Sequence, residues 1–98
     1  MSAEFDQVHN YYEHLVFAEV VRRAYNFPEL TADVLSDVAC VALNQLPPRY
    51  VRHDVDLEFY MVGKEREDVY IALVEAVEYA LNFVRERESI GDSPPSGI

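Results

Sequence analysis

Positive charge is scarce in this sequence, which has eight lysine and arginine residues against eighteen aspartate and glutamate residues and a net charge of −10. Such a chain would repel a nucleic-acid backbone, so nonspecific DNA or RNA binding is not expected. A single cysteine excludes an internal disulfide and suits a reducing compartment. The chain also lacks a signal-peptide pattern and the roughly eighteen uninterrupted apolar residues of a membrane span. These absences predict a cytoplasmic protein that does not insert into a membrane.

Apolar residues, in contrast, are plentiful, since half of the 98 residues are hydrophobic and 12% are aromatic. This composition predicts a folded core rather than a disordered chain. The length suits one domain, which we place at residues 1–88, followed by a flexible tail at residues 89–98. So short and apolar a chain also favours burial of part of its surface in a partner, and we expect a homodimer.

Two segments in the first half of the chain have the hydrophobic period of a helix. The first extends from Phe5 to about Tyr25, and Pro28 then interrupts the pattern. Its expected buried face consists of Val8, Tyr12, Leu15, Val16 and Val20. The second begins at Thr31, an N-cap candidate, and ends at Pro47, because proline cannot donate a backbone hydrogen bond. Its expected inward residues are Val34, Leu35, Val38, Ala39, Ala42 and Leu46.

The second half of the chain combines an alternating segment with a long helix. Between Val55 and Met61 apolar and polar residues alternate, which predicts a short strand or an extended segment lying over the helices. A third helix is predicted from about Glu65 to Arg87. Its apolar stripe consists of Tyr70, Leu73, Val74, Val77, Leu81 and Val84. The predicted fold is therefore mainly α, with about three main helices and a short extended or β segment between the second and third, packed as a homodimer.

Motifs for catalysis and metal binding are sparse. The sequence has no Gly-flanked nucleophilic serine, no HExxH pair and no glycine-rich phosphate loop. His9 and Glu13 are one helical turn apart, but a structural zinc site needs about four ligands. An isolated Cys40 is more typical of a small buried residue. We therefore expect neither a cofactor nor an enzyme. The alternative, a hydrolase, would use Asp33, Asp37 and His53.

Half of the cations flank the alternating segment, with a tyrosine and a histidine beside them. They are Arg49, Arg52, Lys64 and Arg66, together with Tyr50 and His53. Arginine pairs bidentately with phosphate and stacks on purines, and tyrosine can stack on a base. One interpretation of this group is therefore an anion-binding site. The other is that the arginines pair with the neighbouring acidic residues Asp54, Asp56 and Glu58.

Three segments between Asn10 and Val84 carry a family resemblance: NYYEHLVFAEV, DVACVALNQLPPRYV and LVEAVEYALNFV. They resemble the ComFB family, named from a late competence operon, and the central segment is the specific part. The resemblance implies a small, mainly helical dimer that regulates through a cyclic dinucleotide, cyclic di-GMP or in some cases cyclic di-AMP. Relatives often carry a cysteine cluster before the central segment and an arginine at the position of Gln45. Because only Cys40 is present here, a zinc site is not carried over.

Together, the resemblance and the residues predict a receptor that binds a cyclic dinucleotide, cyclic di-GMP first, at or near a dimer interface and signals to a downstream protein. The expected ligand-binding residues are Arg49, Arg52, Tyr50, Asn44, His53 and Arg66. A two-fold symmetric ligand would match a two-fold dimer, which offers each group twice. The alternative function is a protein-interaction adaptor in competence, pilus or motility regulation, with no small-molecule ligand.

The segment LPP is expected to fix the direction in which the chain leaves the second helix. Asn44 would brace this corner by bonding the backbone at the helix end, or it would reach the ligand. Since side chains alternate along an extended segment, Arg49 and Tyr50 point to opposite sides. One strand therefore cannot turn all of these groups toward a single ligand, and Tyr50 could equally belong to the core.

Overall fold

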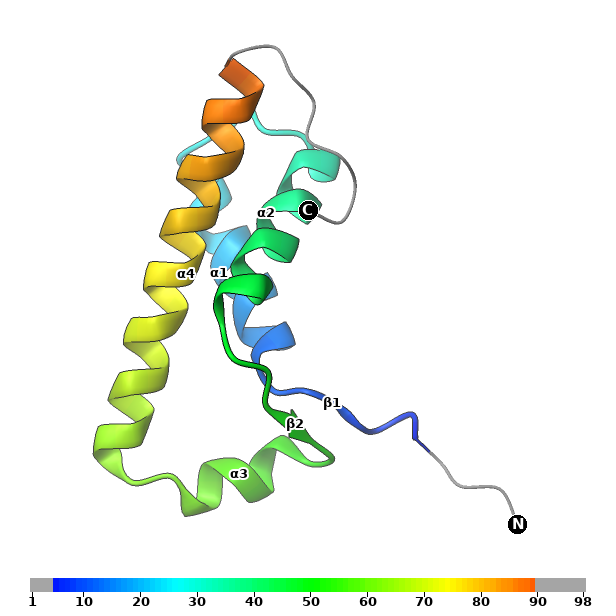
Figure 1. Cartoon of the computed structure of the whole chain (residues 1–98), viewed down its shortest axis with the longest axis vertical. Coiled ribbons are helices and arrows are strands. Elements are labelled where there is room, and N and C mark those ends of the chain that lie inside the picture. Colours follow the sequence, from blue (N-terminus) through cyan, green and yellow to red (C-terminus); the bar gives the residue numbers. More distant parts are fainter. Residues whose placement is uncertain (1–4, 90–98) are drawn as a thin grey trace.

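The structure, a computed structural model, describes residues 5–89. Within these residues the elements are β1 (His9–Asn10), α1 (Tyr12–Ala24), α2 (Ala32–Gln45), β2 (Tyr50–Val51), α3 (Asp54–Tyr60) and α4 (Gly63–Ser89). The long helix α4 packs against both α1 and α2, whereas α3 lies across one end of the molecule, next to the β1–β2 ladder (Figure 1). The predicted mainly α class is confirmed.

The hydrophobic core lies where α1, α2 and α4 meet. Its largest fully buried side chains are Val16, Val38, Val77, Leu81 and Val84. All five occupy positions that the helical period assigned to a buried face, and each such burial stabilises the fold by roughly 1.5–3 kcal/mol relative to exposure. Among residues 5–89, no helix offers a stretch that is both long and apolar enough to cross a membrane.

The ends of α2 and α4 follow from local chemistry. The Thr31 hydroxyl accepts a hydrogen bond from the Val34 amide at 3.3 Å, which confirms the predicted N-cap of α2. This helix ends at Gln45, just before the double proline. α4 begins at Gly63, two residues earlier than expected, and continues to Ser89. The predicted flexible tail beyond that residue lies outside the described residues.

The predicted start of the first helix at Phe5 is wrong, because α1 begins at Tyr12. The side chain of Asn10 explains the late start. Its Oδ1 accepts hydrogen bonds from the backbone amides of Tyr12, at 3.2 Å, and Arg49, at 3.1 Å, and so fixes a change from strand to helix at this point. Val8, which was expected in the core, precedes this change and is 48% exposed.

The prediction of a strand at residues 55–61 is also wrong, because Asp54–Tyr60 form helix α3. No residue of α3 is buried, so the alternation marks no sheltered face. Two contacts to the β1 end of the chain explain the helix: His9 Nε2 lies 2.5 Å from Asp54 Oδ1, and the Tyr11 hydroxyl donates to Glu58 Oε2 at 3.1 Å. His9 and Tyr11 are two residues apart on a nearly extended chain, about 7 Å. One helical turn separates Asp54 and Glu58 by about 6 Å, whereas a strand would separate them by about 13 Å.

Candidate functional site

The corner after α2 is held by the short β1–β2 ladder. The two strands are antiparallel, with Asn10 opposite Tyr50. The same register continued by one residue pairs Tyr11 with Arg49, and the Tyr11 amide donates to the Arg49 carbonyl at 2.7 Å. Both the amide and the carbonyl of Arg49 are therefore bonded to this part of the chain. The prediction that the double proline ends α2 is confirmed, and the ladder fixes the direction of the chain behind it.

The ladder divides the predicted ligand contacts between its two faces. Adjacent residues of an extended chain point to opposite sides, and directly opposite residues share a side. Arg49 therefore points to one side of the ladder, whereas Tyr50 and Arg52 point to the other. Tyr50 is 68% exposed, so the alternative that it belongs to the core is wrong. Arg52 Nε donates to Gln7 Oε1 at 3.2 Å.

The other three predicted residues lie on three further segments. Asn44 Nδ2 donates to the Cys40 carbonyl one turn earlier in α2, at 3.0 Å. His53 is exposed and immediately precedes α3 in an extended conformation. Arg66 lies in the first turns of α4, and its Nη2 donates to the Glu58 carbonyl at 2.7 Å. β2, α3 and the beginning of α4 thus lie toward one end of the molecule, with β2 and α4 at opposite ends of α3, whereas Asn44 belongs to the last turn of α2 (Figure 1).

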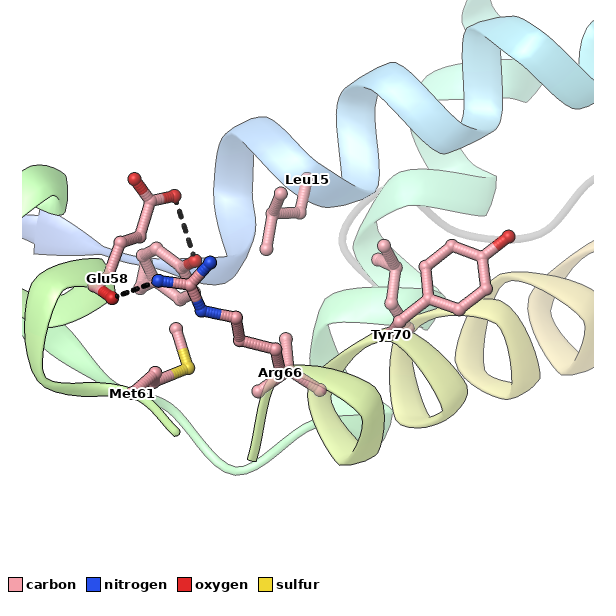
Figure 2. Close-up of a pocket in the computed structure, with 8 residues that line it drawn as sticks. Leu15, Glu58, Met61, Arg66 and Tyr70 are labelled. Carbon is pink, nitrogen blue, oxygen red and sulfur yellow. Dashed lines mark hydrogen bonds between the residues drawn. The ribbon is translucent and has the colours of Figure 1, made fainter. Parts of the chain in front are cut away.

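A cavity of about 400 Å³ lies between α1, the end of α3 and the beginning of α4. It is lined by Tyr11, Leu15, Glu58, Met61, Arg66, Val69, Tyr70 and Leu73. Figure 2 shows Arg66 extending from α4 toward Glu58, beside Met61, with Leu15 on the opposite wall. The lining of the cavity is therefore largely apolar, with the Glu58 carboxylate and the Arg66 guanidinium at its rim. Of the six predicted site residues, only Arg66 lines this cavity.

Tyr11 is the buried polar group of the cavity, with 5% of its surface exposed. Burial, together with the hydrogen bond to Glu58 and the charge of that carboxylate, raises the pKa of Tyr11 to about 12. At neutral pH the phenol therefore remains protonated and donates to Glu58 Oε2. This bond holds the carboxylate of Glu58 in place at the cavity rim.

A second contact attaches α3 to β1. His9 Nδ1 lies 2.7 Å from the Gln7 carbonyl, and its Nε2 lies 2.5 Å from Asp54 Oδ1. The Gln7 carbonyl, and then the Asp54 carboxylate, raise the pKa of His9 above its usual value. When His9 is protonated it donates through both ring nitrogens, so the charged form is the one that these two acceptors favour.

The alternative interpretation of the arginines, pairing with their acidic neighbours, is not what the described residues show. Within residues 5–89, the five ion pairs shorter than or equal to 4.0 Å include none between Arg49, Arg52 or Arg66 and the acidic residues of α3. Asp54 instead contacts His9. The guanidinium of Arg49 makes no hydrogen bond or ion pair with any described residue, although the backbone of Arg49 is fixed.

Sequence reasoning missed Tyr11 and Glu58. Tyr11 fell inside the predicted first helix, from Phe5 to about Tyr25, and its polar role depends on the end of β1. Glu58 was hidden by the assignment of its segment to a strand. One signal was available: Asp54 and Glu58 are four residues apart, and the acidic residues at the start of the segment favour a helix N-terminus.

A second surface feature is an apolar groove of about 540 Å³ between α1 and α2. Its lining includes Phe17, Val21, Leu35, Ala39, Cys40 and Leu43. Phe17 is 47% exposed and Val21 64% exposed, which is unusual for two large apolar residues on one helix face. Cys40 lies in this groove, and the described residues contain no group of three or more His, Cys, Asp or Glu side chains that could hold a metal ion.

The model of the family described as late competence development protein ComFB matches residues 9–88, which is most of the chain and includes every element from β1 to nearly the end of α4. No curated protein matches the chain.

Proposed function

Because the chain belongs to the ComFB family of late competence development proteins, we propose that it is a receptor for a cyclic dinucleotide, with cyclic di-GMP as the first candidate. It would bind this ligand without chemical turnover and pass the signal to a protein partner. The resemblance of the central segment to receptors of this kind supports the ligand class. The observations below support the position of the site.

The observation that carries the proposal is the Arg49 guanidinium. The backbone of Arg49 is held by hydrogen bonds to Asn10 and Tyr11, whereas its guanidinium group makes no polar contact within residues 5–89. An arginine whose backbone is held and whose guanidinium N–H groups have no partner among the described residues is suited to a phosphate, which it can bind bidentately. In a chain of net charge −10, a local cation also concentrates the attraction for an anion at one place. The Arg49 carbonyl accepts the amide of Tyr11, and Tyr11 lines the cavity that also contains Arg66.

A second copy of the chain is proposed to cover the α1–α2 groove. The groove is almost wholly apolar, and the exposed side chains of Phe17 and Val21 would gain from burial against an identical surface. A two-fold dimer would present two copies of Arg49 and two cavities. This number matches the two phosphates and two bases of a cyclic dinucleotide.

Calorimetry with cyclic di-GMP, cyclic di-AMP and GMP tests the proposal. We expect Arg49→Ala to lower the affinity for the preferred cyclic dinucleotide at least about tenfold, because a charge-assisted hydrogen bond contributes about 1.5–3 kcal/mol. Arg52→Ala is the matched control, since Arg52 points to the other face and already contacts Gln7. It should lower the affinity less than Arg49→Ala does.

Two outcomes would contradict this assignment. If Arg49→Ala stays folded and binds as tightly as the parent protein, Arg49 is not a ligand contact. If chromatography shows protein-dependent loss of intact ligand, the protein is an enzyme and the receptor proposal is wrong.

The second candidate function, an adaptor without a small-molecule ligand, is favoured by the surface of α3. Val55, Phe59 and Tyr60 are 68%, 78% and 78% exposed, and α3 has no buried residue. Such an exposed apolar helix is a feature of protein-interaction surfaces. Absence of heat with every nucleotide in the panel would favour the adaptor.

A further inference from the structure

The cavity rim presents one acceptor group and one donor group side by side. Glu58 Oε2 accepts the Tyr11 hydroxyl, and the other oxygen of that carboxylate has no hydrogen-bond partner among the described residues. The Arg66 guanidinium uses its Nη2 on the Glu58 carbonyl, which leaves its other N–H groups for a ligand. Figure 2 shows both groups at the same edge of the cavity, with the apolar side chains of Met61 and Leu15 beside them.

This arrangement suits a flat molecule that has donors and acceptors next to each other along its edge and ring faces that can pack on apolar side chains. A guanine base has these properties. Its N1–H and N2–H₂ donors suit a carboxylate, and its O6 and N7 acceptors suit an arginine fork. The faces of the ring can pack on apolar and aromatic side chains such as Met61 and Tyr70. The volume of about 400 Å³ falls within the usual range for small-molecule sites, which is large enough for one base.

We propose that the cavity between Tyr11, Glu58 and Arg66 is a base subsite selective for guanine. This inference rests on the proposed function, since the base would belong to a bound cyclic dinucleotide whose phosphate contacts Arg49. Glu58 would bind the N1 and N2 donors, and Arg66, which lies beside Glu58, would bind the neighbouring O6 acceptor. Tyr11 would act as a positioning residue, because its hydroxyl holds the Glu58 carboxylate and does not need to contact the ligand.

Glu58 is also the group that excludes adenine. Adenine presents an acceptor, N1, where guanine presents a donor, so the Glu58 carboxylate would face a lone pair instead of a proton. A site in which two acceptors face each other disfavours the wrong base more strongly than a site that merely loses an apolar contact. The parent protein should therefore prefer cyclic di-GMP to cyclic di-AMP.

The test is the Glu58→Gln variant, titrated by calorimetry with cyclic di-GMP and with cyclic di-AMP. The amide oxygen still accepts the Tyr11 hydrogen bond, so the local fold is retained, and a thermal melt verifies this. The amide presents a donor where the carboxylate presented an acceptor. We expect the affinity for cyclic di-GMP to fall at least about tenfold and the preference over cyclic di-AMP to narrow by a similar factor. Glu67→Gln on the exposed surface of α4 removes the same charge and should leave both affinities unchanged.

The outcomes separate this inference from the function on which it rests. If the parent protein binds cyclic di-GMP and Glu58→Gln binds it equally well, the base subsite is wrong and the receptor proposal stands. If the parent protein binds cyclic di-AMP more tightly than cyclic di-GMP, the guanine subsite is likewise wrong and the receptor proposal stands. If the parent protein binds neither ligand, the receptor proposal and the subsite are both refuted.

Discussion

Tyr11 offers a direct test of the contact that organises the cavity. Its hydroxyl is buried and donates to Glu58, and its pKa is raised from 10 to about 12, mainly by burial. Two perturbations follow: deprotonation of the phenol at high pH, and removal of the hydroxyl by Tyr11→Phe. Both abolish the hydrogen bond, but only the first also creates a buried charge beside a carboxylate.

The sign and the size of the pH effect follow from the raised pKa. A group whose pKa is higher in the folded state contributes stability that is fully present below its unfolded pKa and is lost as the pH rises through the folded pKa. For Tyr11 this window extends from about pH 10 to about pH 12. A difference of about two units corresponds to about 2–3 kcal/mol, as an upper limit. Near neutral pH, loss of the hydroxyl should cost only about 1 kcal/mol, because the exposed Glu58 carboxylate is rehydrated.

Urea unfolding near pH 8 and again near pH 12 measures both effects. The parent protein should lose more stability between the two conditions than Tyr11→Phe, which has no phenol to ionise at this position. Tyr25→Phe is the control, because it removes the same hydroxyl group from a side chain that is 87% exposed. If the parent protein, Tyr11→Phe and Tyr25→Phe lose the same stability over this pH range, Tyr11 is not held as a neutral donor and the reasoning is wrong.

The helical core could be predicted from the sequence because burial and periodicity agree there. Val16, Val38 and Val77 each lie on one apolar stripe, and each is fully buried. The N-cap at Thr31 and the stop at Pro47 are equally local, since each depends on a hydrogen bond that the residue itself makes or cannot make. These features require no knowledge of distant parts of the chain.

The site could be predicted only in part because its contacts join residues far apart in the sequence. Tyr11 and Glu58 are 47 residues apart, and the Asn10 side chain reaches the Arg49 amide across 39 residues. The alternating segment is a helix because the spacing of Asp54 and Glu58 in a helix fits their partners His9 and Tyr11. The alternation of apolar and polar residues carries no information about these partners. Arg49 was identified from charge and position, but its separation from Arg52 onto another face depends on the register of the ladder.

Two further predictions concern the dimer and the attachment of α3. Val21→Glu in the α1–α2 groove should give a monomer of 11.3 kDa by light scattering. The parent protein and the control Ile71→Glu, on an exposed position of α4, should give twice that mass. A monomeric parent protein would contradict the proposed dimer. Asp54→Asn should lower the pKa of His9 toward its usual value in an NMR titration, but not fully, because the Gln7 carbonyl is the first cause of the increase. Since the pKa of His9 is raised in the folded state, this contact stabilises the protein below about pH 6.5 and weakens as the pH rises through the raised value. Release of α3 on the alkaline side of this titration would open the cavity beside Glu58. An unchanged His9 titration in Asp54→Asn would show that Asp54 does not hold β1 to α3.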